Sequence, residues 1–193
     1  MVNIALVGCN GKMGKAVTSA VQSRNDCEIV FGADPFGTPA YDYPVFESLA
    51  VSDKKADVII DFSNPASLDD ILAYALEKKI PCVLCTTGYS PEQVEKIKKA
   101  SESVAVFYSG NMSLGINLLI ELSKEAAKIL SAADFDIEIV EKHHNQKIDA
   151  PSGTALMIAD GISDTLAEEP QYVYDRHSYR KKRSKNEIGI HSV

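Results

Sequence analysis

The sequence predicts an α/β protein in which a parallel sheet, covered by helices on both faces, is followed by a second, smaller α+β domain. Over the first 110 residues, short apolar runs alternate with amphipathic stretches of helical spacing, which is the pattern of βαβ units. One long apolar-periodic stretch over residues 114–130 then breaks this pattern, and a new strand-like run begins at Asp136. A domain boundary is therefore expected between residues 111 and 130, with domains over residues 1–112 and 113–193.

Strands are expected where apolar and β-branched residues cluster, and helices where apolar residues recur every three or four positions. The expected strands are Asn3–Val7, Glu28–Gly32, Asp57–Phe62, Pro81–Cys85, Val104–Tyr108, Asp136–Glu141 and Ile188–Val193. The expected helices are Met13–Ser23, Ala66–Lys79, Pro91–Glu102, Leu114–Leu130 and Ser152–Leu166. Ligands of a parallel sheet bind outside the carboxyl ends of its strands, so the loops after the strands are the places to search for function.

Composition excludes several classes of protein. Of the 193 residues, 45% are hydrophobic and 24% charged, as in globular proteins. No apolar run approaches the roughly 18 residues that span a bilayer, and Met1 leads into a strand without a basic secretory region. A net charge of −7 disfavours general binding to nucleic acid or anionic lipid. We expect a cytoplasmic protein with neither a nucleic-acid nor a membrane partner.

One segment has the opposite charge. Six of the ten residues from Arg176 to Lys185 are lysine or arginine. The sequence leaves two main interpretations open, a solvated loop or a mobile basic flap that attracts an anionic substrate or cofactor. A nucleic-acid-binding arm is a third.

The four cysteines raise the question of a disulfide or a zinc site, because Cys82 and Cys85 have C-x-x-C spacing. They lie in an apolar run after Pro81 that is typical of a buried strand. Two residues an odd number of positions apart on a strand point to opposite faces. We therefore predict inert core thiols.

The first expected strand ends in a glycine-rich turn, Gly8-Cys9-Asn10-Gly11-Lys12-Met13-Gly14. This spacing is one residue off the usual G-x-G-x-x-G of Rossmann-like dinucleotide-binding domains. Gly8 would make the tight turn, Gly11 would let the backbone approach a pyrophosphate, and Gly14 would allow close packing of helix on sheet. The alternative is a set of ordinary turn glycines.

Asp34 follows the second expected strand, where an acidic side chain can accept hydrogen bonds from the adenosine ribose. The neighbouring Pro35 and Phe36 offer no cation for a 2′-phosphate, so NADH is favoured over NADPH, with use of both left open. A turn-capping aspartate is the alternative.

Two further loops at strand ends contain small and polar residues, Cys85-Thr86-Thr87-Gly88 and Ser109-Gly110-Asn111-Met112. Such loops let a nicotinamide lie against the backbone, although either could equally be an ordinary turn.

The run from Asp136 to Ala155 concentrates acid chemistry and anion binding. His143 and His144 come just past a strand, Lys147 follows, and Ser152-Gly153-Thr154 opens a helix whose first N–H groups have no partner within the helix. An imidazole can donate a proton, while an ammonium and a helix N-terminus bind carboxylates. The run predicts one polyanion-binding site, which suits a carboxylate substrate that must be protonated.

A metal site is not expected in this run. Two histidines with Glu141 or Asp149 are too few ligands for zinc, and the positive charge of Lys147 would repel the ion.

These residues resemble the 4-hydroxy-tetrahydrodipicolinate reductase (dihydrodipicolinate reductase) family. The resemblance extends over essentially the whole chain, and it is strongest at the turns Gly8–Gly14, Cys85–Gly88, Ser109–Gly115 and Glu138–Ala155, the last of which holds the specific pattern E-x-H-H-x-x-K-x-D-A-P-S-G-T-A. It implies NAD(P)H-dependent reduction of a cyclic dicarboxylic acid to tetrahydrodipicolinate, with loss of water, in lysine and diaminopimelate biosynthesis.

The resemblance also implies roles for individual residues. The catalytic residues would be His143 and Lys147, and the resemblance leaves open which of them donates the proton. The substrate-binding residues would be His144, Ser152, Gly153 and Thr154. The cofactor contacts would be Gly8, Cys9, Asn10, Gly11, Lys12, Met13, Asp34, Cys85, Thr86, Thr87, Ser109, Gly110, Asn111 and Met112. Cys85 stands where members of the family usually have glycine.

Members of the family usually continue past Val193 into further strands and a final helix, which build much of a homotetramer interface. The resemblance thus implies a substrate-binding and oligomerisation domain that is shortened at its C-terminus. A dinucleotide-binding module with weak or no activity is the alternative from another functional class. An oxidoreductase of similar fold that acts on a different acid is a third hypothesis.

Overall fold

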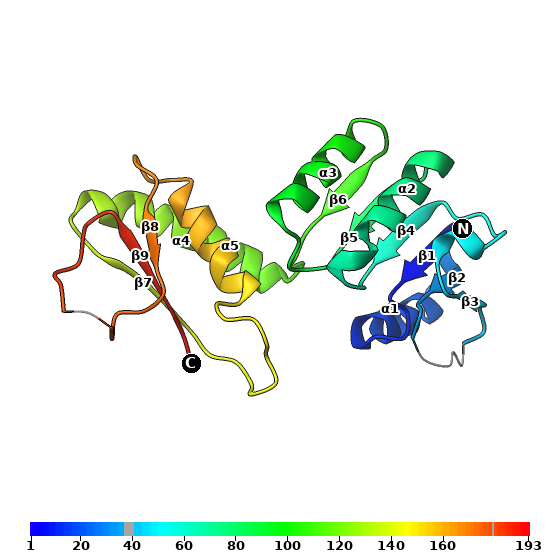
Figure 1. Cartoon of the computed structure of the whole chain (residues 1–193), viewed down its shortest axis with the longest axis horizontal. Helices are drawn as coiled ribbons and strands as arrows, with labels where there is room; N and C mark the ends of the chain where they lie inside the picture. Colours follow the sequence, from blue (N-terminus) through cyan, green and yellow to red (C-terminus); the bar gives the residue numbers. More distant parts are fainter. Residues whose placement is uncertain (37–40, 179) are drawn as a thin grey trace. The chain divides into compact units, whose positions relative to one another are not determined.

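The protein folds into two compact units, Met1–Gly110 and Asn111–Val193 (Figure 1). The structure is a computed structural model that describes residues 1–36, 41–178 and 180–193. Each unit has its own sheet, helices and apolar core, and each is described by itself.

The first unit is built on a six-stranded sheet in which every neighbouring pair is parallel. The strand order is β3-β2-β1-β4-β5-β6. The strands are β1 (Val2–Val7), β2 (Cys27–Ala33), β3 (Val45–Phe46), β4 (Val58–Asp61), β5 (Cys82–Leu84) and β6 (Val106–Tyr108). The helices are α1 (Lys12–Gln22), α2 (Leu68–Lys78) and α3 (Pro91–Ser101), with short 3-10 turns η1 (Leu49–Val51) and η2 (Pro65–Ser67).

Helices cover both faces of this sheet because the side chains of a strand alternate between its faces. Ala5 and Val7 of β1 belong to a core shared with α2 and α3. Ile4 and Leu6 of the same strand belong to a second core, shared with α1. Each large apolar side chain that is fully buried in this way stabilises the folded state by roughly 1.5–3 kcal/mol.

Local signals explain where the helices begin. Ser90 and Gln93 form a capping box at the start of α3: the Gln93 amide donates to Ser90 Oγ at 3.3 Å, and the Ser90 amide donates to Gln93 Oε1 at 3.0 Å. Ser113 is the N-cap of α4 and Ser152 the N-cap of α5, because each side chain accepts a backbone N–H from the first turn of its helix. The elements that were not predicted are β3, η1 and β8, each only two or three residues long and without a periodic signal; η2 overlaps the start of the helix expected from Ala66.

The second unit has a three-stranded sheet of order β7-β9-β8, again with parallel neighbours. Its elements are α4 (Leu114–Ala132), β7 (Ile137–Glu141), α5 (Gly153–Ser163), β8 (Gln171–Val173) and β9 (Glu187–Ser192). Ile188 and Ile190 of β9 are buried together with Ala155 and Ala159 of α5 and Ala127 of α4. The expected fold class, a parallel Rossmann-like sheet followed by a smaller α+β unit, is confirmed. In the described part of the chain, none of the helices has the length and hydropathy to cross a membrane.

The basic segment at residues 176–185 connects β8 to β9 and pairs with acidic side chains. We call this cluster the ionic cover; it consists of Arg176, Lys181, Arg183 and Lys185 with Asp134, Asp136, Glu138 and Glu187. Arg176 lies 3.0 Å from Glu138 and 2.9 Å from Glu187. Tyr179, within the same segment, lies outside the described residues. The structure thus gives these four cations intramolecular partners, which neither the solvated-loop nor the flap interpretation anticipated.

The ionic cover makes stability depend on pH. The ammonium of Lys185 and the guanidinium of Arg176 hold the pKa of Asp136 and of Glu187, respectively, below their usual ranges. Because the folded pKa values lie below the unfolded ones, of about 4, the stabilisation is present above about pH 4.5 and is lost as the pH falls through the folded values. We expect Asp136→Asn to make the fall of Tm between about pH 5 and about pH 2 shallower than in the wild type.

The matched control is Asp53→Asn, which changes an exposed aspartate of the first unit and should keep the wild-type slope. Equal slopes for all three proteins, measured by circular dichroism, would contradict the stabilising role of the ionic cover.

Candidate active site

The strand ends of the first unit are aligned along one edge of the sheet. The last residues of five strands are successive partners across the sheet, in the order Ala33 (β2), Val7 (β1), Asp61 (β4), Leu84 (β5) and Tyr108 (β6). The loops that follow these strands therefore line up along the same edge, as the parallel order requires.

The glycine turn after β1 is closely packed. Gly8 has a φ of +75°, and a Cβ there would lie 2.5 Å from the carbonyl oxygen of Phe62. A Cβ on Gly14 would lie 2.3 Å from the carbonyl oxygen of Gly8. Both positions therefore require glycine, one for its conformation and both for space.

The turn leads into a helix with an open N-terminus. Gly11 is the N-cap of α1, and no side chain in the described residues caps it. The first N–H groups of such a helix, together with the helix dipole, attract anions. A glycine turn without room for a Cβ at Gly8 or Gly14, followed by the uncapped start of α1, fits the pyrophosphate of a dinucleotide.

The Asp34 carboxylate is held against this turn. Its Oδ2 accepts the backbone N–H of Asn10 at 3.0 Å, and its Oδ1 accepts that of Phe36 at 2.9 Å. The Asn10 side chain in turn donates to the Phe36 carbonyl at 2.5 Å. Each carboxylate oxygen can accept a further hydrogen bond, so Asp34 can still bind a ribose hydroxyl.

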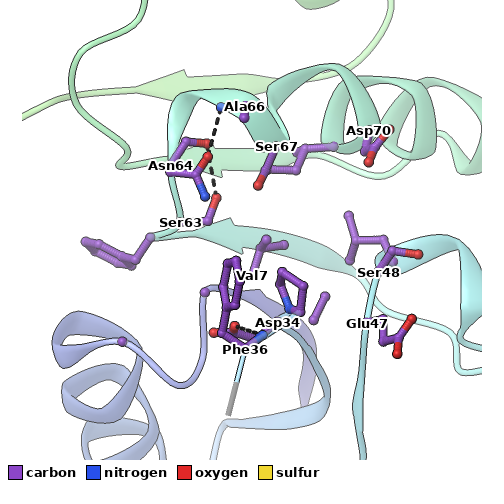
Figure 2. Close-up of a pocket in the computed structure, with 17 residues that line it drawn as sticks. Val7, Asp34, Phe36, Glu47, Ser48, Ser63, Asn64, Ala66, Ser67 and Asp70 are labelled. Carbon is purple, nitrogen blue, oxygen red and sulfur yellow. Dashed lines mark hydrogen bonds between the residues drawn. The ribbon is translucent and has the colours of Figure 1, made fainter.

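A cleft of about 560 Å³ opens beside Gly8, Gly11 and Asp34. In Figure 2, Asp34 and Phe36 lie on one side of it, and Ser63, Asn64 and Ser67 lie on the other. Its other lining residues are Val7, Ala33, Pro35, Glu47, Ser48, Leu49, Phe62, Ala66, Asp70 and Ile71. The lining combines acidic and hydroxyl side chains with apolar ones, which suits a nucleoside.

The wall of the cleft that follows β4 was not predicted from the sequence. Ser63 and Asn64 are the second and third residues after the end of that strand, and Ser67 lies in η2. The rule that strand ends carry ligand contacts applied to this loop as much as to the others. Glu47 and Ser48 could not be predicted by this rule, because the two-residue strand β3 that precedes them was not predicted.

Two of the predicted cofactor contacts are buried cysteines. Cys9 is fully buried in the core with α1, and Cys85 is 8% exposed. Burial, reinforced by the charges of Asp34 and Asp61, raises the pKa of Cys9 to about 11 and that of Cys85 to about 12. Burial likewise raises the pKa of Cys82 to about 11. All four cysteines are free thiols, so Cys9 and Cys85 can offer a cofactor their backbone but not their side chains.

The remaining predicted contacts of the first unit lie outside the lining of the cleft. Lys12 and Met13 are exposed at the start of α1. Thr86 is buried, and the loops after β5 and β6 are adjacent, since a Cβ on Gly110 would lie 3.5 Å from Thr87 Cγ2. These loops continue the row of strand ends beyond the cleft.

Asp61, at the end of β4, connects these loops. Its buried carboxylate accepts the backbone N–H of Ser63 at 2.9 Å, the Ser63 hydroxyl at 2.5 Å and the Tyr89 hydroxyl at 3.1 Å. Burial and the charge of Asp61 raise the pKa of Tyr89, which keeps this hydroxyl protonated as a donor.

In the second unit, the predicted catalytic residues follow β7. His143 Nδ1 lies 3.1 Å from Glu141 Oε2, and the imidazole is 39% exposed. The neighbouring His144 has a different partner, because its Nδ1 accepts the backbone N–H of Gln146 at 3.2 Å. The backbone turns at this point, since the Lys147 N–H bonds the His144 carbonyl at 3.1 Å.

Lys147 is paired with an aspartate of the same turn. Its ammonium lies 2.7 Å from Asp149 Oδ1. This ammonium and backbone N–H groups, including that of Gly153, hold the pKa of Asp149 below its usual range. Asp149 is thus the anion that the turn binds in this structure.

The turn ends at the start of α5. Ser152 is 2% exposed, and its Oγ accepts the backbone N–H of Ala155 at 3.1 Å as the N-cap. Thr154 Oγ1 accepts the side-chain amide of Asn111 at 3.0 Å. Asn111, predicted as a cofactor contact, therefore lies against a predicted substrate-binding residue.

A parallel sheet with a closely packed glycine turn, an acidic residue at the next strand end and a cleft beside both defines a dinucleotide-binding α/β protein. Comparison with known proteins identifies the family. Residues 2–112 match the family model for the N-terminus of dihydrodipicolinate reductase, and residues 115–193 match the model for its C-terminus. The chain belongs to the dihydrodipicolinate reductase family.

Individual relatives support the same family assignment. The 4-hydroxy-tetrahydrodipicolinate reductase of Clostridium tetani is 52% identical over 193 residues, which are 100% of this chain and 75% of that protein. The enzyme of the same name from Caldanaerobacter subterraneus subsp. tengcongensis is 49% identical over 100% of this chain and 76% of its own. The resemblance inferred from the sequence motifs is thus confirmed.

A solved structure has the same fold. The dipicolinate-bound dihydrodipicolinate reductase from Paenisporosarcina sp. TG-14 superposes with a TM-score of 0.74 at 27% identity, covering 100% of this chain and 78% of its own. A dehydrogenase from Chromobacterium violaceum, with a TM-score of 0.55 at 17% identity over 82% of this chain and 50% of its own, is similar in fold alone.

The packing of the glycine turn can be measured with two alanine substitutions. Gly8 and Gly88 both have positive φ, but among the described residues a Cβ at Gly88 would meet just Pro65 Cγ, at 3.9 Å. Gly88→Ala should therefore cost about 1–2 kcal/mol for the backbone conformation alone. We expect Gly8→Ala to lower the free energy of unfolding by about 1–3 kcal/mol more than Gly88→Ala, because it also clashes with Phe62. Equal losses in urea unfolding would contradict the close packing.

Proposed function

We propose that this chain catalyses the reduction of 4-hydroxy-tetrahydrodipicolinate to tetrahydrodipicolinate, with loss of water, using a nicotinamide dinucleotide. The observation that carries the proposal is the turn between β7 and α5. It gathers two imidazoles, an ammonium and the N-terminus of α5 within a dozen residues. The names of the relatives and the family models support the same reaction.

The dicarboxylate substrate needs two anion-binding groups, and the turn offers them. Lys147 and the backbone N–H of Gly153 already bind one carboxylate, that of Asp149. We infer that a substrate carboxylate takes the place of Asp149 at these donors. His144 and Thr154 then complete the binding of the substrate, whereas Ser152, whose N–H bonds Glu141 and whose Oγ accepts from Ala155, shapes the turn.

A nicotinamide dinucleotide supplies the hydride when it is bound. Gly8, Gly11 and the start of α1 would hold its pyrophosphate, and Asp34 would bind its ribose. The Asp34 carboxylate favours NADH because it accepts hydrogen bonds from free ribose hydroxyls and repels a 2′-phosphate. The loops after β5 and β6 would contact the nicotinamide through their backbone.

Addition of a hydride to the unsaturated ring leaves negative charge on the conjugated system. An imidazolium or an ammonium beside it can stabilise that charge and supply the proton. We assign the proton to His143, because Lys147 is already engaged in carboxylate binding. Lys147 then acts by its charge.

Asp34→Ala is expected to change the cofactor preference. Loss of the carboxylate removes a ribose contact and the repulsion of a 2′-phosphate. NADH binding should weaken about tenfold, whereas NADPH binding should stay equal or improve. Titration of intrinsic NADH or NADPH fluorescence measures both. Asp70→Ala, at another acidic position that lines the cleft, is the control and should leave the NADH to NADPH ratio unchanged. A constant ratio in Asp34→Ala would contradict the role of Asp34.

His143→Ala and Lys147→Ala are expected to reduce turnover. Loss of the acid should lower kcat about 10²–10⁴-fold, whereas loss of the ammonium should raise KM as well, because it binds the substrate. The unstable substrate can be generated in place with a dihydrodipicolinate synthase while NADH absorbance is followed. Lys142→Ala, an exposed neighbour, is the matched control and should keep wild-type rates.

The wild-type protein decides between the functional classes in the same assay. NADH binding without substrate-dependent oxidation would favour a dinucleotide-binding module over the reductase. Full activity of His143→Ala would instead overturn only the assignment of the acid.

A further inference from the structure

The carboxylate of Glu141 links three segments of the second unit. Its Oε1 accepts the backbone N–H of Ser152 at 2.6 Å and the hydroxyl of Ser192 at 2.8 Å. Its Oε2 faces His143 Nδ1 at 3.1 Å, and the side chain is only 10% exposed. One nearly buried group thus contacts the start of α5, the end of β9 and the proposed acid.

The two carboxylate oxygens are not equally satisfied. Oε1 has two donors, whereas Oε2 is buried and lacks a hydrogen-bond partner of good geometry in the described residues. A buried carboxylate oxygen without a donor is costly. His143 Nδ1 lies 3.1 Å from it, within hydrogen-bonding distance, on an imidazole that is 39% exposed.

The charge state of Glu141 favours this bond. Burial alone would raise the pKa of Glu141, but the donors of Ser152 and Ser192 and the charge of His143 outweigh it, so that its pKa lies below the usual range. The group is an anion that can only accept hydrogen bonds. A neutral His143 beside it must therefore carry its proton on Nδ1.

His144 provides the contrast one residue further on. Its Nδ1 accepts a backbone N–H from Gln146, so the proton of neutral His144 is on Nε2. The two adjacent histidines therefore hold opposite tautomers because their Nδ1 atoms face partners of opposite kind.

We propose that Glu141 is the positioning residue of the active site, which holds the proton of His143 on Nδ1 and leaves Nε2 as the atom that gains and donates the catalytic proton. His144 keeps a permanent Nε2–H for binding substrate. The proposal rests on the reductase function proposed above and adds a residue that acts through His143.

The proton transfer balances with Glu141 unchanged. In the imidazolium form both ring nitrogens of His143 carry a proton. The Nε2–H bond breaks, its electron pair stays on Nε2, and the proton forms a new C–H bond at the ring carbon that became negative when its conjugated partner received the hydride. The product is the neutral Nδ1–H imidazole, which the Glu141 anion stabilises.

Glu141 also fixes where the acid lies relative to the anion-binding turn. The same carboxylate binds the Ser152 N–H, one residue before the Gly153 N–H that faces the bound anion. The proposed acid and the proposed carboxylate site are thereby held to one rigid group, as positioning of a proton donor requires.

Glu141→Gln separates this role from a structural one. The glutamine Oε1 can still accept the N–H of Ser152 and the hydroxyl of Ser192, so the turn keeps its hydrogen bonds. Its NH₂ group faces His143 Nδ1, which must then accept and move the proton to Nε2. We expect kcat to fall by about 10²–10⁴-fold with little change in KM, because the acid is lost and the binding groups remain.

Glu138→Gln is the matched control. Glu138 lies on the same strand, and its Oε2 is 2.6 Å from His191 Nε2, so it forms a second Glu–His pair outside the proposed site. The control should leave kcat within about threefold of the wild type, as expected for a residue without a catalytic role. Circular dichroism and Tm of both variants report whether the fold is retained.

The tautomers can be read directly from ¹⁵N chemical shifts of the histidine rings in alkaline buffer, without substrate or cofactor. We expect Nδ1–H for His143 and Nε2–H for His144 in the wild type, and Nε2–H for both in Glu141→Gln. A wild-type His143 with its proton on Nε2 would overturn the proposal, as would a Glu141→Gln protein with unchanged tautomer and kcat. If this variant does not fold, the wild-type spectra decide alone. Absence of turnover in the wild type would refute the proposed function, and the spectra would still decide the placement of the proton.

Discussion

Each unit depends on one buried carboxylate at the end of a strand. A carboxylate removed from water must be compensated by donors, so the loops around it are held where they can provide them. In the first unit, Asp61 accepts bonds from Ser63 and Tyr89 and thereby connects the loops after β4 and β5. In the second unit, Glu141 binds Ser152 and Ser192 and faces His143. The same physical requirement shapes both candidate ligand sites.

The rest of each unit supports these carboxylates by burial. Alternation along β1 sends Ala5 and Val7 to one core and Ile4 and Leu6 to the other, so the sheet that ends at Asp61 is covered on both faces. The second sheet has an apolar core that includes Ile188 and Ile190, while the ionic cover compensates its acidic side chains. The positions of the strand ends, and of the loops beyond them, follow from these packed faces.

The elements that were predicted correctly are those with a long periodic pattern or a clear cap. All five expected helices and all seven expected strands are present, with bounds that differ by at most three residues at any end. The start of α3 was predicted from Ser90 and Pro91, but the reciprocal hydrogen bond of Gln93 in the capping box was not. The missed elements β3, η1 and β8 have two or three residues each and show no period. The strands β5 and β6 are as short, but they lie in the longer apolar runs Pro81–Cys85 and Val104–Tyr108, which predicted them. The ionic cover was missed for a different reason: Arg176 and Glu138 are 38 positions apart, and only the crossover from β8 to β9 brings them together.

The sequence by itself determined the fold class and the family, and it predicted where the two candidate sites lie. These depend on patterns that are local along the chain: apolar periods, the glycine spacing after β1 and the run of groups from His143 to Thr154. Only the tertiary structure decided which groups meet. It sent the side chain of Cys9 into the core, added Ser63 and Asn64 to the cleft, paired Lys147 with Asp149 and set Glu141 against His143 and Ser152. A hydrogen bond depends on distance and direction, and these are properties of the packed strands and loops that a residue pattern does not contain.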